Sequence, residues 1–226
     1  MRQHTPALAA VLSGWLLLSA GLAPGDEQPQ EPAKSDAPAT KPDAAEQPED
    51  KVKTREVKLR DLTLTVPETW KQGDPSNNLR LGEFDIPPVE DDGDEPVELT
   101  VFTFGGGGSV QQNIERWINQ LDAEGRKAKV TTGEAPQGRY VFVEISGTYQ
   151  QPVGPPILRQ TETLPEARML AVILGIPEKG VYYLKMAGRE KTVAANEQHL
   201  RRSFGGDAEQ EKPLDLDGET GGESEP

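Results

Sequence analysis

The stretch MLAVILGI at residues 169–176 decides the fold of this chain. It is apolar on both faces of an extended strand, which is typical of a strand with packed layers on either side. The turn PEKG follows at residues 177–180, and VYYLKM at residues 181–186 then returns with β-forming side chains. We therefore predict a hairpin with residues 169–176 at the centre of a sheet.

Alternating apolar and polar residues predict further strands around this hairpin. The expected strands are residues 57–59, 62–66, 79–86, 99–104 and 140–145. The first two face each other across Arg60-Asp61, which predicts an opening hairpin. The apolar phase of the third changes at Gly82, and a glycine at such a change predicts a β-bulge.

Two segments change from strand spacing to helical spacing. The first carries one apolar stripe formed by Val110, Ile114, Trp117, Ile118 and Leu121. Ser109 and Gln112 form a capping box at its start, and Gly125 suits its end. A second helix is expected from Thr192 to Phe204. Runs of strands separated by helices predict an α+β domain, an antiparallel sheet with helices packed on it.

Nearly all the excess acidity lies in the two ends of the chain. The formal net charge is −14, to which residues 26–50 contribute −6 and residues 207–226 contribute −7, whereas residues 51–206 carry 20 basic and 22 acidic side chains. Residues 26–52 and 207–226 have too few large apolar residues to fold, so we predict a disordered linker and a disordered tail around one domain at residues 53–206. Nucleic-acid binding is not expected, because it needs a basic footprint.

Residues 1–25 have the features of an export signal. Arg2 precedes an apolar stretch at residues 7–22, which small residues interrupt and which is short for a membrane span. We predict cleavage between Ala20 and Gly25 and a periplasmic or secreted protein. The alternative is an uncleaved segment that anchors the chain in a membrane.

The composition excludes several kinds of chemistry. The chain has no cysteine and two histidines, His4 and His199. Thiol nucleophiles, disulfides and cysteine-ligated zinc are therefore excluded, and a site built on histidine would depend on one residue of the processed chain. We expect no cofactor and no metal.

Several motifs resemble those of the Mog1/PsbP-like domains. LTVPETWK at residues 64–71 resembles the "strand, Pro, x, x, Trp" opening of these domains, and LRRSF at residues 200–204 resembles the helix that closes them. Residues 81–120 are similar to a version found in uncharacterised exported bacterial proteins. The resemblance spans residues 57–205 and implies an α/β/α sandwich. It supplies no catalytic residues, and members of this superfamily bind partners as different as a photosynthetic complex and a small GTPase, so it selects no partner.

A glycine run and one face of the first helix form the candidate binding site. The candidate residues are Gly105, Gly106, Gly107, Gly108, Ser109, Asn113, Arg116 and Gln120. Free N–H groups at a helix N-terminus attract anions, and an arginine can clamp a carboxylate or a phosphate. The alternatives are a plain strand-to-helix connection for the glycines and a surface ion pair for Arg116.

Two loops are the remaining candidates. The acidic run at residues 90–95 does not have the spacing of a calcium-binding loop, and we predict a solvated hairpin loop there. The proline-rich loop at residues 150–165 is longer than a plain connection needs, so it either binds a partner or is simply mobile.

These observations favour a noncatalytic binding or accessory module whose partner is a protein or a small anionic ligand. The alternative is a hydrolase or transferase that uses carboxylates alone. Glu98 and Glu144, both on expected strands or beside them, are the candidate acids for that alternative.

Overall fold

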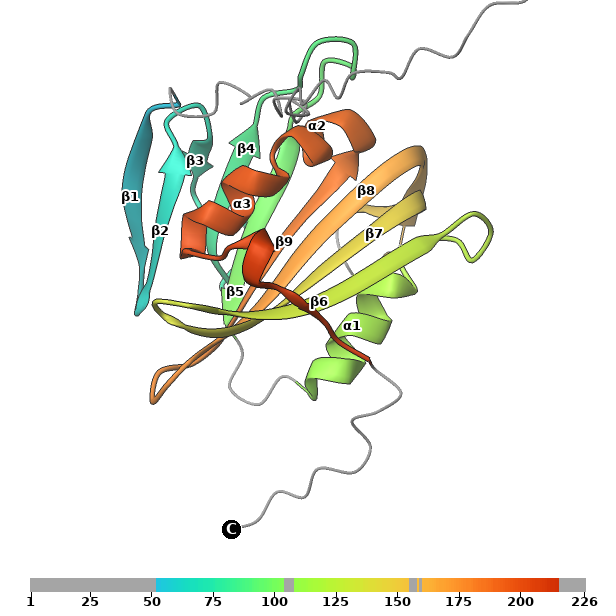
Figure 1. Cartoon of the computed structure of the whole chain (residues 1–226). Coiled ribbons are helices and arrows are strands. Elements are labelled where there is room, and N and C mark those ends of the chain that lie inside the picture. The colour runs from blue at the N-terminus through green and yellow to red at the C-terminus, as the bar shows by residue number, and fades with distance from the viewer. Residues whose placement is uncertain (1–51, 104–107, 155–157, 159, 216–226) are drawn as a thin grey trace, which may run out of the picture. The chain divides into compact units, whose positions relative to one another are not determined.

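A computed structural model describes residues 52–103, 108–154, 158 and 160–215. Its centre is an eight-stranded sheet with the strand order β10-β6-β7-β8-β9-β5-β4-β3, in which all neighbouring strands are antiparallel (Figure 1). The strands are β3 (Lys71–Gly73), β4 (Arg80–Ile86), β5 (Val97–Thr103), β6 (Lys127–Ala135), β7 (Gly138–Val153), β8 (Gln160–Ile176), β9 (Gly180–Arg189) and β10 (Lys212–Pro213).

Helices and a separate hairpin cover the two faces of this sheet. On one face, β1 (Thr54–Leu59), β2 (Leu62–Pro67) and α3 (Glu197–Phe204) enclose an apolar cluster that includes Trp70, Phe84 and Leu170. On the other face, α1 (Val110–Ile118) covers a second cluster around β7, β8 and β9 (Figure 1). The predicted α+β fold is confirmed.

The central hairpin, the opening hairpin and the bulge are also confirmed. β8 and β9 pair through Ile176 and Gly180, and β8 lies in the interior of the sheet. β1 pairs with β2 around Arg60-Asp61. The register of β4 against β5 shifts between Arg80 and Gly82, where a side chain on the glycine would strike Leu59.

The first helix has the predicted capping box but is shorter than its apolar stripe. Ser109 and Gln112 cap each other reciprocally, and the helix ends at Asn119 rather than near Gly125. Arg126 donates to the carbonyls of Ile118 and Leu121 at 2.9 Å each, which satisfies the backbone groups left open by this early end. Val110 is 40% exposed, so the stripe packs from Ile114 onward.

The second helix is interrupted, which the apolar spacing did not reveal. α2 (Glu190–Ala195) and α3 meet at Asn196. The Asn196 side chain accepts a hydrogen bond from Trp70 Nε1 at 3.0 Å and donates one to the Thr192 carbonyl at 2.8 Å. The break thus supplies a partner for a buried indole. The expected end of the helix at Gly205 is confirmed, because this residue has the left-handed conformation that suits glycine.

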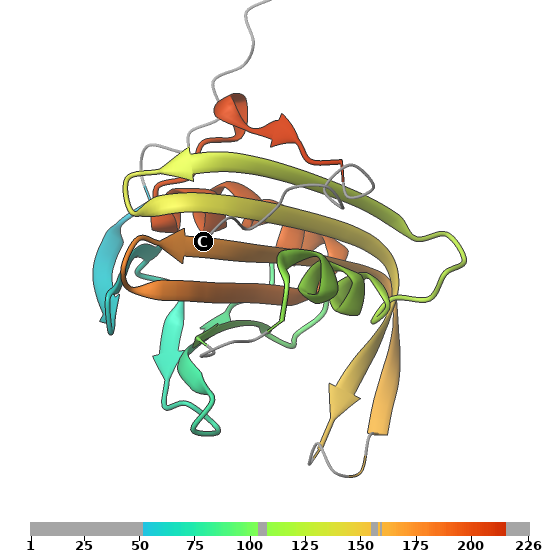
Figure 2. The ribbon, with the colours of Figure 1, turned by 90° about the horizontal axis from the view of Figure 1, so that it is seen from below.

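The loop predicted at residues 150–165 is mostly strand. β7 and β8 continue past the sheet as a two-stranded arm, which projects from the molecule in Figure 2. Its register is interrupted between Gly147 and Tyr149. The two strands of the arm pair from Tyr149 opposite Leu164 to Val153 opposite Gln160, with Pro152 opposite Thr161. Residues 155–157 and 159 of the predicted loop lie outside the described residues.

The acidic run at residues 90–95 contacts the second helical segment. Asp92 Oδ2 accepts a hydrogen bond from the Thr192 N–H at 2.6 Å, and Lys191 Nζ donates to the Asp91 carbonyl at 3.1 Å. The carboxylate therefore caps α2 from a distant part of the chain. The run is not only a solvated loop, as the sequence predicted, but also a structural contact.

The folded domain extends beyond the predicted boundary at Gly206. A 3-10 turn at Ala208–Gln210 precedes β10, which pairs with β6. Glu211 is the reason, because its side chain is 4% exposed and pairs with Arg201 Nε at 2.8 Å. The chain is thus part of the domain as far as Asp215. The predicted signal, most of the linker and the tail after Asp215 lie outside the described residues.

The helices of the described residues include none that is long and apolar enough to cross a membrane.

Candidate functional site

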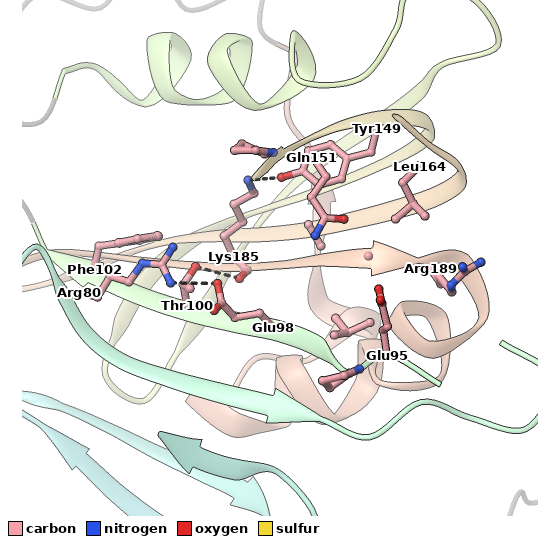
Figure 3. A pocket seen from close by; sticks show the side chains of 15 residues that line it. Arg80, Glu95, Glu98, Thr100, Phe102, Tyr149, Gln151, Leu164, Lys185 and Arg189 are labelled. Atoms are coloured by element: carbon pink, nitrogen blue, oxygen red, sulfur yellow. Dashed lines mark hydrogen bonds and ion pairs between the residues drawn. The ribbon is translucent and has the colours of Figure 1, made fainter. Parts of the chain in front are cut away.

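A cavity of about 220 Å³ opens on the sheet face that α1 covers only in part (Figure 3). β5 and β9 form its floor, and the base of the β7–β8 arm forms one wall. Its labelled lining residues are Arg80, Glu95, Glu98, Thr100, Phe102, Tyr149, Gln151, Leu164, Lys185 and Arg189. We call this cavity the β5–β9 groove.

Lys185 is the central charged residue of the groove. It projects from β9 and its ammonium group donates to Gln120 Oε1 at 2.6 Å and to Tyr149 Oη at 3.0 Å. The Nζ atom also lies 5.2 Å from the centroid of the Tyr149 ring. These partners are all uncharged, and among the described residues Lys185 forms no ion pair. A half-buried ammonium without a carboxylate in contact can attract an anion.

The groove alters the titration of two of its residues. Burial is the main cause that lowers the pKa of Lys185 to about 8; the positive charges of Arg80 and Arg116 contribute, and Glu98 opposes them. Burial raises the pKa of Tyr149 to about 12, with Glu98 contributing. At neutral pH the lysine therefore carries its charge, and the tyrosine keeps its proton.

Arg80 and Glu98 lie on the opposite side of the groove, and Glu83, which is outside the lining, pairs with the same arginine. Arg80 Nη1 lies 2.6 Å from Glu83 Oε1 and 3.0 Å from Glu98 Oε1. Arg80 is placed by the β4 bulge, so the predicted irregularity at Gly82 positions a charged side chain. Burial raises the pKa of Glu98, although Arg80 opposes this. Glu98 is nevertheless 47% exposed, so its pair with Arg80 is open to solvent and to ligand.

Among the described residues of the predicted site, only Gln120 forms a hydrogen bond with a residue that lines the groove. Gln120 accepts the hydrogen bond from Lys185, whereas Asn113 is buried and donates to the Ser109 carbonyl at 2.9 Å. Arg116 is exposed and donates to the Asn113 side chain, so it influences Lys185 only through its charge. Ser109 serves as the helix cap.

The glycine run is largely outside the described residues. Gly105, Gly106 and Gly107 are not described, and Gly108 has a positive φ of 83° next to the helix cap. Gly108 therefore serves the turn into α1.

The two candidate acids lie on opposite faces of the sheet. Glu98 is in the groove, but Glu144 is on the other face, where it pairs with Arg168 at 2.5 Å. Arg168 also pairs with Glu197 at 2.7 Å and with Glu190 at 3.4 Å. Glu144 thus belongs to a network that joins β7 and β8 to α2 and α3. The two carboxylates do not converge on one substrate.

Sequence reasoning missed Lys185, Tyr149 and Arg80. The signal for Lys185 was present, because a lysine interrupts the β-forming run VYYLKM on the strand that partners the central one. A lysine on a strand that pairs with a buried strand indicates an opening in the layer that covers the sheet. Among the described residues no group of three or more His, Asp or Glu side chains is arranged to hold a metal.

No family model matches this chain, and no curated protein matches it. Two solved structures that match are cyanobacterial PsbP (CyanoP) from Synechocystis sp. PCC 6803 and the Ran-binding protein Mog1p from Saccharomyces cerevisiae. The PsbP structure is 12% identical to this chain with a TM-score of 0.41, and the match covers 72% of this chain and 94% of the PsbP chain. The Mog1p structure is 13% identical to this chain with a TM-score of 0.40, and the match covers 74% of this chain and 98% of the Mog1p chain.

Proposed function

We propose that this protein is an exported, noncatalytic binding module that holds an anionic group of its partner in the β5–β9 groove. The observation that carries the proposal is Lys185, a half-buried ammonium whose hydrogen-bond partners are a neutral amide and a neutral phenol. A carboxylate placed beside it would complete a charge-assisted hydrogen bond in a partly desolvated site, where such bonds are strong.

The rest of the groove favours a carboxylate on a protein partner. Arg80, which pairs with Glu83 and Glu98, is a second cation of the lining, and Phe102 and Leu164 add apolar surface to it. An extended peptide with one acidic side chain or a free C-terminus offers both a carboxylate and apolar surface.

A noncatalytic role is supported by the positions of the ionisable groups. Glu98 in the groove pairs with Arg80, and Glu144, the other candidate acid, lies across the sheet in its own ion-pair network. General acid and base catalysis needs two groups on one reacting bond, and this pair is not placed to act on one.

Titration of the labelled protein with two matched peptides tests the binding site. One peptide carries free carboxylates, and the other has the same sequence with every carboxylate replaced by an amide. We expect only the acidic peptide to shift the amide resonances of β5 and β9 at pH 7. Lys185→Met should weaken this binding at least about tenfold, which corresponds to about 1.4 kcal/mol.

The matched control is Lys179→Met, which removes an equally charged side chain, 54% exposed, from the β8–β9 turn. It should leave the affinity unchanged. Equal binding of the two peptides, or equal affinity of the Lys185 and Lys179 variants, would contradict the proposal.

Export is supported by the composition of residues 1–25 alone. N-terminal sequencing of the protein from the envelope or the medium tests it. We expect a first residue between Gly21 and Asp26, and recovery of the intact N-terminus from a membrane fraction would argue for an anchor instead.

A further inference from the structure

The amine of Lys185 lies in an open cavity and contacts only uncharged groups. Its Nζ donates to Gln120 Oε1 at 2.6 Å and to Tyr149 Oη at 3.0 Å, and it lies 5.2 Å from the centroid of the same tyrosine ring (Figure 3). Among the described residues no carboxylate forms an ion pair with it, and Glu98 of the same groove pairs with Arg80 instead. A partly buried ammonium without a bound carboxylate is less stable than one in water.

The fixed charges around Lys185 also disfavour its charged form. Arg80 of β4 and Arg116 of α1 oppose the ammonium charge, whereas Glu98 of β5 supports it. Burial is the larger cause, and together these effects bring the pKa of the amine to about 8. At pH 7.5 about a quarter of this amine is uncharged, compared with about 0.1% of an ordinary lysine. The uncharged amine is the nucleophilic form.

The same surroundings suit a negative charge at this position. Arg80 and Arg116 destabilise a cation here and therefore stabilise an anion. Burial raises the pKa of Tyr149 to about 12, so its hydroxyl keeps a proton that it can donate to an acceptor oxygen. The cavity of about 220 Å³ that Lys185 lines leaves room for a group of three atoms on Nζ. A reaction that replaces the ammonium by an anion is thus favoured at this residue.

We propose that Lys185 is a site of reversible carbamate formation with carbon dioxide. The uncharged Nζ attacks the carbon atom of carbon dioxide, an N–C bond forms, and the electron pair of one C=O π bond moves to its oxygen. Nζ then releases one proton to solvent, so the amine and carbon dioxide give a carbamate and a proton. The remaining N–H can donate to Gln120, and a carbamate oxygen can accept from Tyr149. The modification does not depend on the binding function proposed above.

Carbon-13 NMR of the full chain in labelled bicarbonate at pH 7.5 detects the carbamate. The α-amino terminus has a pKa of about 7.7–8.0 and forms a carbamate of its own in every variant, so it serves as the internal reference. We expect two carbamate resonances in the unsubstituted chain and one in Lys185→Arg, which keeps the charge but not the amine. The matched control Lys179→Arg replaces an exposed lysine that pairs with Asp61, and it should keep both resonances. One resonance in the unsubstituted chain, or two in Lys185→Arg, would overturn the proposal.

Chemical trapping locates the modification without any substitution. Trimethyloxonium converts a carbamate into a stable methyl ester, and mass mapping of the peptides then identifies the amine that carried it. We expect the label at Lys185 and at the α-amino terminus, but not at Lys179, which is 54% exposed. Label at the α-amino terminus alone, or equal label at the two lysines, would contradict the proposal.

Two substitutions that act on Lys185 through charge rather than contact should change carbamate formation in opposite directions. Glu98→Gln removes a negative charge that supports the ammonium and opposes the carbamate, so it should raise the carbamate fraction at least about twofold. Arg116→Gln removes a positive charge that does the reverse, so it should lower this fraction by a similar factor. Neither residue forms a hydrogen bond with Lys185. Any result other than opposite changes would overturn the electrostatic basis of the site.

Discussion

Glu211→Ala should destabilise the protein strongly, although this residue lies in a segment that the sequence predicts to be disordered. Glu211 and Arg201 form a salt bridge with side chains only 4% and 3% exposed. Removing one partner of a buried pair typically costs 3–5 kcal/mol, because the other charge stays buried. Arg201 keeps Glu197 at 2.5 Å and lies 3.7 Å above the Phe142 ring, so we expect the lower end, about 3 kcal/mol.

Thermal and urea unfolding of the full chain at pH 7 measure this effect. A loss of about 3 kcal/mol lowers Tm by about 6–12 °C in a domain of this size. Glu209→Ala is the matched control, because Glu209 is exposed two residues away on the same segment. A change below about 0.5 kcal/mol for Glu211→Ala would refute the conclusion that the segment belongs to the domain.

The same variant should alter the pH dependence of stability. Burial raises the pKa of Glu211, but hydrogen bonds from Arg201 and Thr131 outweigh it and hold the pKa below the usual 4.5. The stabilisation is therefore complete above about pH 4.5 and is lost as the pH falls through the lower pKa of the folded state. The free energy of unfolding of Glu211→Ala should fall less steeply with acid below pH 4.5.

Three further substitutions have defined outcomes. Asn196→Ala leaves the buried indole N–H of Trp70 without its acceptor and should cost about 1–3 kcal/mol in urea unfolding. Gly138→Ala would place a Cβ 2.0 Å from the Gly175 carbonyl oxygen at a φ of 154°, and should cost more than about 3 kcal/mol or prevent folding, as measured by circular dichroism. The free energy of unfolding should rise from pH 8 to 9.5, because over this range Lys185 binds more protons in the unfolded state than in the folded state. This rise should be absent in Lys185→Met.

The sheet could be predicted because its signals are local. The apolar run of β8, its turn and the returning strand are contiguous in sequence, and burial on both faces follows from composition alone. The bulge at Gly82 is also a local signal, because a register shift changes the apolar phase of the strand that contains it.

The errors concern residues whose partners are distant in sequence. Asn196 breaks a helix because Trp70 needs an acceptor there, and Glu211 is ordered because Arg201 lies on the preceding helix. Helical periodicity does not report such partners. The β7–β8 arm was predicted to be a loop because prolines disfavour strands, yet Pro152 lies near the tip of a two-stranded arm that leaves one side of each strand unpaired.

The candidate site was predicted only in part for the same reason. Gln120 was selected for its position on a helix face, and it does reach the groove, but through a lysine on β9 that is 65 residues away. The glycine run and Arg116 were selected for what each residue type does at a helix N-terminus or beside an anion. The proposed anion site depends on Lys185, whose surroundings depend on three strands and one helix.

The difference between the two sheet faces explains why a groove forms on one of them. The β1–β2 hairpin and α3 cover the first face, where β5 presents Leu99 and Val101, both fully buried. The second face is covered by α1, a helix of nine residues, and the fully buried residues of the cluster beneath it come from β7, β8 and β9 but not from β5. β5 therefore carries Glu98, Thr100 and Phe102 on that face in alternation with its core residues. A buried strand with polar residues on one face is stable only beside an opening, and in this protein that opening is the groove that exposes Lys185 to a ligand.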